Sequence, residues 1–125
     1  MSNSRIKRLV MTNEFMDNVI NIRVEHTVDI LSKKALEYVR NNDRLHNFNV
    51  GAELENKTRE EVLHSFFLKH YISYLDMLED IKNDKLPKKS YVDEKMGDMI
   101  NYLILQEASI KQKIIEKERE ISESE

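Results

Sequence analysis

The scarcity of glycine and proline constrains this 125-residue chain more than any other feature of its sequence. The chain holds two glycines and one proline, and neither residue occurs between Asn13 and Val39. A fold of many β-strands needs frequent turns, which depend on these residues. The composition therefore disfavours a β-rich fold and predicts an all-α protein.

Three long stretches carry apolar residues at the three- and four-residue steps of an amphipathic helix. The first runs from about 13 to 39. The second runs from about 58 to 83 and opens on a capping box formed by Thr58 and Glu61. The third runs from about 90 to 115. We expect these three helices to form an antiparallel bundle.

Polar residues mark the predicted helix ends. Thr12 or Asn13 is expected to cap the first helix, and the run 41–43 to end it. A short fourth helix is predicted within 44–55, ended by Asn56. Residues 1–11 are expected to form a basic arm, 12–115 the helical domain and 116–125 a frayed acidic tail.

Each long helix is predicted to bury one apolar stripe. The members are Met16, Ile20, Val24, Thr27, Leu31 and Ala35, then Leu63, Phe67, Tyr71, Tyr74, Leu78 and Ile81, then Val92, Met96, Met99, Leu103, Ile110 and Ile114. A single layer of three helices has too little interior for all of them. We therefore expect a second copy to cover part of this surface as a homodimer.

The bulk composition excludes several classes of protein. The chain has no cysteine, which rules out a thiolate zinc site. Its formal net charge is -3, which disfavours a globally basic nucleic-acid binder. No apolar run approaches the roughly 20 residues that span a bilayer. We expect no membrane association and a cytoplasmic location.

Four carboxylates are candidates for a metal site. Asp76 and Glu79 are three residues apart on the second helix, and Glu94 and Asp98 are four apart on the third. If the helices run antiparallel across the Pro87 connector, the two pairs can meet and bind Mg²⁺. The alternative is that they are solvated charges beside a turn.

Other polar and aromatic residues are candidates for nucleotide binding. One group lies in and beside the irregular segment after the first helix, where Arg44 would contact a phosphate and an aromatic ring a base. The candidates are Tyr38, Asp43, Arg44, Asn47, Phe48, Lys69, His70 and Asn101. The alternative is that they serve helix ending, core packing and a solvated surface.

The run Asp93-Glu-Lys-Met-Gly-Asp-Met-Ile-Asn-Tyr-Leu103 resembles the last core helix of MazG-like proteins, all-α nucleoside triphosphate pyrophosphohydrolases. It is also similar to phage nucleotide-modification-associated helical domains. The span from Glu25 to Leu105 resembles small phage proteins through the successive runs 43–48, 69–70 and 76–77.

The resemblance implies that Asp76, Glu79, Glu94 and Asp98 hold Mg²⁺ for the hydrolysis of a nucleoside triphosphate. Lys95 stands where the family has an acidic residue. Three hypotheses follow: a Mg²⁺-dependent pyrophosphohydrolase, a non-catalytic protein that sequesters a nucleotide signal, and a helical module that inhibits a host protein.

Overall fold

The computed structural model describes residues 8–33, 39–40 and 42–124, and all the regular elements among them are helices, with no strand. Helix α1 spans Asn13–Val28 and continues into a π-helical segment, η2, at Asp29–Lys33. Helix α2 spans His46–Glu55, α3 spans Arg59–Lys82 and α4 spans Lys89–Ser124. These bounds confirm the predicted all-α class and the short helix in 44–55.

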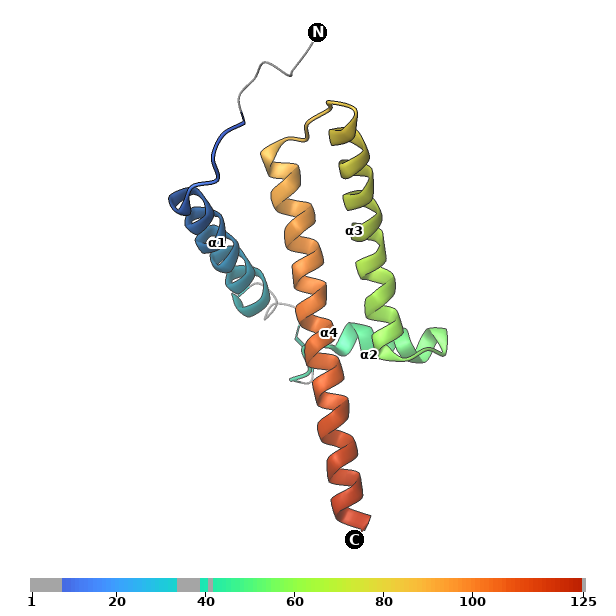
Figure 1. The fold of residues 1–125 in the computed structure, drawn as a ribbon. Coiled ribbons are helices and arrows are strands. Elements are labelled where there is room, and N and C mark those ends of the chain that lie inside the picture. The colour runs from blue at the N-terminus through green and yellow to red at the C-terminus, as the bar shows by residue number, and fades with distance from the viewer. Residues whose placement is uncertain (1–7, 34–38, 41, 125) are drawn as a thin grey trace.

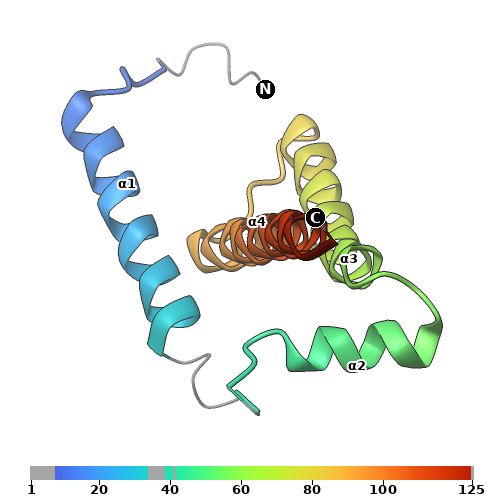
Figure 2. The same ribbon diagram turned by 90° about the horizontal axis from the view of Figure 1, so that it is seen from below.

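Helix α4 is the element on which α1 and α3 pack. It runs antiparallel to α3, and α2 crosses the foot of α3 (Figure 1). Seen along its axis, α4 lies between α1 and α3 (Figure 2). Its 36 residues make it about 54 Å long, so its C-terminal part extends beyond the other helices.

The predicted capping residues Thr12, Thr58 and Asn56 lie at the helix boundaries, as expected. The Thr12 hydroxyl accepts a hydrogen bond from the Phe15 amide at 3.1 Å. Thr58 and Glu61 form the reciprocal capping box. Asn56 closes α2 in the left-handed conformation, with φ of 55°, which asparagine tolerates better than most residues. Local side-chain chemistry therefore sets these boundaries.

Two predicted helix extents need correction. The first helix changes from α to π bonding at Asp29, a change that apolar periodicity does not reveal, and the expected stretch 34–38 lies outside the described residues. The acidic tail does not fray at 116, since α4 continues to Ser124. Its Lys and Glu residues favour helix, and Lys117 lies 3.6 Å from Glu120 one turn away.

The core of the single chain is small. Among the described residues, four hydrophobic side chains are buried: Leu45, Val62, Leu63 and Met77. Helix α1 has no buried residue. Nine residues of the predicted stripes are 38–56% exposed in the single chain: Met16, Ile20, Val24, Tyr71, Leu78, Ile81, Leu103, Ile110 and Ile114. Periodicity identified an apolar helix face, but the single chain provides no partner to cover it.

Candidate functional site

A cluster of aromatic and acidic side chains lies where α3 packs on α4. The His70 ring stacks on Tyr102, with ring centroids 5.5 Å apart and planes 19° apart. Its Nδ1 lies 3.3 Å from Oδ2 of Asp98. Phe66 stacks on the same tyrosine at 5.9 Å. We call Phe48, Phe66, His70, Asp98 and Tyr102 the aromatic–acidic cluster.

Helical spacing builds this cluster. Phe66 and His70 are one turn apart on α3, and Asp98 and Tyr102 are one turn apart on α4, so each pair shares a helix face. Phe48 of α2 meets Phe66 and Tyr102 edge-on, with centroids at 5.6 and 6.3 Å. Three predicted site residues, Phe48, His70 and Asp98, are thus brought together.

The site prediction missed two members of the cluster, Phe66 and Tyr102, and the second of them can ionise. Burial raises the pKa of its phenol, and the nearby charge of Asp98 raises it further. Tyr102 lies in the run that resembles the MazG-like helix, and this position was a signal that it could belong to the site. Periodicity alone gave no reason to separate it from the neighbouring core residues.

Two amide side chains of α4, each with a buried oxygen, flank the cluster. Asn101 is 8% exposed, and its Oδ1 has no hydrogen-bond partner in the described part of the chain. Gln106 donates from Nε2 to the Glu60 carbonyl at 2.9 Å, but its Oε1 is likewise unpaired among the described residues. An acceptor buried without a partner is costly, so the unpaired Oδ1 supports Asn101, the nucleotide-binding candidate predicted in this helix, as a ligand contact.

Gly97 makes room for an arginine of α1. Arg23 donates from Nη2 to the Asp93 carbonyl at 3.0 Å. A Cβ at position 97 would lie 2.7 Å from Nη1 of Arg23, closer than such contacts allow. The glycine therefore lets the guanidinium lie against α4 and fixes where α1 crosses it.

The four candidate metal ligands do not converge in the single chain. No group of three or more His, Asp or Glu side chains suited to a metal occurs within residues 8–33, 39–40 and 42–124. Asp98 faces His70, Glu94 is 63% exposed beside Lys95, and Asp76 and Glu79 are exposed.

The register of the two helices explains the separation of Asp76 from Asp98. In an antiparallel pair, His70 is the neighbour of Asp98 at the same level. Asp76 is six residues further along α3, which corresponds to about 9 Å along the axis. The sequence placed both carboxylate pairs near the connector but did not give the register.

The remaining nucleotide-binding candidates have separate surroundings. Asp43 accepts hydrogen bonds from the Leu45 amide at 2.9 Å and from Asn49 Nδ2 at 2.7 Å, which holds the start of α2. Lys69 lies 5.4 Å from the Phe66 ring centroid. Asn47 is exposed on α2. Tyr38 lies outside the described residues, and Arg44 lines an apolar pocket described below.

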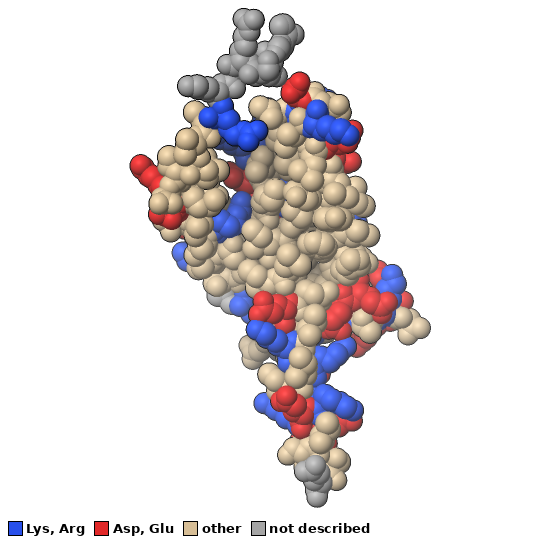
Figure 3. Space-filling model, in the orientation of Figure 1, with Lys and Arg blue, Asp and Glu red and all other residues tan. Residues whose placement is uncertain are grey.

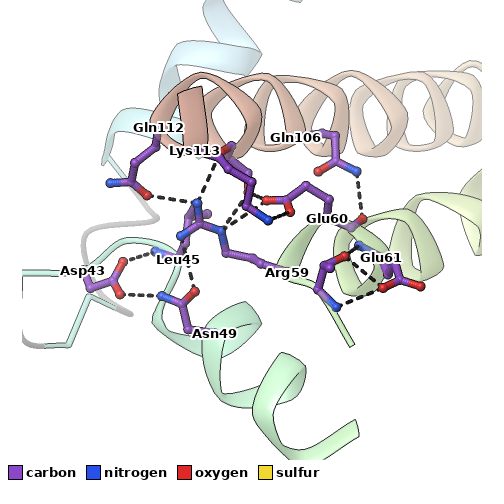
Figure 4. A network of polar contacts seen from close by, with 11 residues as sticks. Asp43, Leu45, Asn49, Arg59, Glu60, Glu61, Gln106, Gln112 and Lys113 are labelled. Atoms are coloured by element: carbon purple, nitrogen blue, oxygen red, sulfur yellow. Dashed lines mark hydrogen bonds and ion pairs between the residues drawn. The ribbon is translucent and has the colours of Figure 1, made fainter. Parts of the chain in front are cut away.

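A second polar site, which the sequence analysis missed, centres on Arg59 (Figure 4). Its Nε donates to Ser109 Oγ at 2.7 Å, and Nη2 donates to Gln112 Oε1 at 2.9 Å. Nη1 donates to Asn49 Oδ1 at 3.3 Å. These bonds join the starts of α2 and α3 to the middle of α4.

Glu60 completes this network. It accepts hydrogen bonds from Ser109 Oγ and from Lys113 Nζ. Burial by itself would raise the pKa of the Glu60 carboxyl, but these hydrogen bonds outweigh it and the pKa lies below its ordinary value. An open polar pocket of about 730 Å³ lies over the network, but its arginine is fully engaged in the structure.

Comparison of the chain with known protein families, with curated proteins and with solved structures gave no match. Within the described residues, no helix combines the length and the apolar character needed to cross a membrane.

Proposed function

We propose that this protein binds a nucleotide through the aromatic–acidic cluster and acts on it as MazG-like proteins do, by Mg²⁺-dependent release of pyrophosphate. The observation that carries the proposal is the placement of His70 against both Asp98 and Tyr102. A carboxylate, a ring nitrogen and a stacked aromatic surface thereby meet, within the run that resembles the family.

Each member of the cluster has a chemical role in this proposal. Asp98 supplies the oxygen ligand that a hard cation prefers, and the cation supplies positive charge for the phosphates. His70 pairs with Asp98 and fixes the orientation of its carboxylate. Asn101, one turn from Gly97, offers a buried acceptor to a ligand donor.

The proposed active form is a homodimer. On α1, Phe15, Val19 and Ile22 lie on one face at 58%, 48% and 43% exposure. Uncharged residues also dominate the view over α3 and the first half of α4, whereas charged residues gather around α2 and the end of α4 (Figure 3). Large apolar side chains exposed together on one helix face are typical of a protein interface. A partner copy can also bring further carboxylates to Asp98, which a single chain does not.

The same exposed apolar surface favours a second function, a helical module that binds another protein. In that case the α1 face and the charged C-terminal half of α4 would dock a host protein. This function needs neither Asp98 nor Mg²⁺, so the two proposals make opposite predictions for an Asp98 variant.

The test is pyrophosphate release from a panel of canonical and modified nucleoside triphosphates, with and without Mg²⁺, together with calorimetric binding to the same panel. We expect metal-dependent release that Asp98→Asn abolishes. Asp80→Asn, which removes an exposed carboxylate from α3, is the matched control and should retain activity.

The outcomes separate the three hypotheses. Tight binding of a nucleotide without turnover identifies a non-catalytic binder at the same cluster. Absence of both binding and release across the panel contradicts nucleotide recognition and leaves the protein-binding module. Circular dichroism of Asp98→Asn must match the parent for the loss of activity to count as chemical.

A further inference from the structure

A second cavity lies between α4 and the segment formed by the end of α1 and η2. It measures about 400 Å³ and is lined by apolar side chains of α1, η2 and α4, together with residues before α2. The residues that carry the argument are Leu31, Arg44, Leu45, Leu105 and Ala108. A largely apolar pocket of this size is typical of a small-molecule site.

One cation stands at this apolar pocket. Arg44 lines it, is exposed, and makes no hydrogen bond or ion pair with any described residue. By contrast, Arg59 and Arg23 both donate hydrogen bonds within the protein. An apolar pocket with a free guanidinium beside it suits a ligand that has a flat apolar body and an anionic group.

The pocket is connected to the aromatic–acidic cluster along α4. Asp98, Asn101 and Leu105 follow one another at steps of three and four residues, so they lie along one side of the helix. Asp98 and Leu105 are about 10.5 Å apart along the axis. The buried, unpaired Oδ1 of Asn101 stands between them.

The wall of the pocket contains the π-helical segment. Leu31 and Ser32 belong to η2 and line the cavity. Helical segments with π bonding are costly and occur frequently at functional sites. This observation is independent of the charge at Arg44 and points to the same cavity.

We propose that this pocket receives the base of the nucleotide, and that Arg44 contacts a phosphate of the same ligand. The inference rests on the proposed function and names the subsite that would select the substrate. The pocket gives apolar contact to a heterocyclic ring, and Arg44 distinguishes a nucleotide from an uncharged nucleoside.

Two variants separate the two parts of the ligand. Ala108→Phe fills the pocket, and Arg44→Gln removes the cation without adding bulk. Their matched controls are Leu54→Phe, at a side chain that is 81% exposed on α2, and Arg40→Gln, at an exposed arginine four residues before Arg44. Binding is measured by calorimetry with the full chain.

The probes are nucleoside triphosphates, the corresponding nucleosides and inorganic tripolyphosphate. We expect Ala108→Phe to weaken nucleotide and nucleoside binding at least tenfold and to leave tripolyphosphate unchanged. Arg44→Gln should weaken triphosphate and tripolyphosphate binding about tenfold and leave the nucleoside unchanged. Both controls should bind like the parent.

Several results would overturn the inference. If the parent binds nucleotides and neither variant alters the affinity, the base lies elsewhere while the proposed function stands. If Ala108→Phe only converts dimer to monomer, the pocket is a contact between copies. If the parent binds no nucleotide, the proposed function itself fails. Arg44→Gln is a surface change, so it keeps the test decisive even if the pocket-filling variant misfolds.

Discussion

Arg59 at the start of α3 donates a hydrogen bond from Nε to Oγ of Ser109 in the middle of α4, at 2.7 Å and across 50 residues of sequence. Ser109 is completely buried, and its hydroxyl donates a hydrogen bond to the Glu60 carboxylate. One small hydroxyl thus satisfies a cation and an anion at once. These hydrogen bonds fix the position of α4 along its axis relative to α3 and α2.

Ser109→Ala should lower the free energy of unfolding by about 1–3 kcal/mol, because it leaves buried polar partners unpaired. Urea denaturation followed by circular dichroism measures the change. Ser73→Ala removes a hydroxyl that bonds only the Lys69 carbonyl of its own helix, so it should cost less than Ser109→Ala. Equal costs would show that the Arg59 network adds nothing to stability.

Leu63→Ala should destabilise the chain by about 2–5 kcal/mol, since its side chain is 1% exposed and its removal leaves a cavity. Leu68→Ala, on the same helix but 41% exposed, should cost far less in the same urea titration. If the cost of Leu68→Ala rises with protein concentration and exceeds that of Leu63→Ala, the exposed face of α3 is covered by a second copy.

Acid should destabilise the fold partly through Glu60. Its folded-state pKa lies below the ordinary value, so its contribution is fully present above the unfolded pKa and is lost as the pH falls through the folded pKa. Unfolding free energies measured between about pH 6 and pH 3 should decline with a shallower slope in Glu60→Gln. Glu118→Gln, an exposed change near the end of α4, should keep the parent slope.

Tyr102 should ionise at higher pH than a tyrosine in an unfolded peptide, because burial and the charge of Asp98 both raise its pKa. Its contribution to stability is therefore present below the unfolded pKa and is lost as the pH rises through the folded pKa. Ultraviolet titration of tyrosinate, with Tyr102→Phe to assign the signal, measures this. Asp98→Asn should bring the pKa down only in part, because burial is the larger cause.

Val19→Lys should convert the protein from dimer to monomer in sedimentation equilibrium, where one chain has a mass of 14.9 kDa. Val19 is 48% exposed on the apolar face of α1, and a lysine there would put a charge into the proposed interface. Asn21→Lys introduces the same charge at an exposed position on the opposite side of the helix and should leave the dimer intact. A monomeric parent would refute the interface outright.

The structure brings together only some of the predicted site residues. The others lie apart because the packing of the helices cannot be read from local sequence patterns. His70, Asp98 and Phe48 meet because helix spacing and α3–α4 pairing place them at one level. Asp76 lies about two turns away along α3, a difference of register that no local pattern reveals. The Arg59–Ser109 bond was missed because a serine inside an apolar stretch gives no signal of its long-range partner.

The sequence by itself determined the helices. The capping residues Thr12, Thr58 and Asn56, together with the scarcity of glycine and proline, set most helix boundaries, since these effects act within one turn of the chain. Only the tertiary structure decided which faces meet. It buried Ser109 and Asn101 while leaving the apolar face of α1 exposed, because burial depends on the register and contacts between helices, which the periodicity of one helix does not contain.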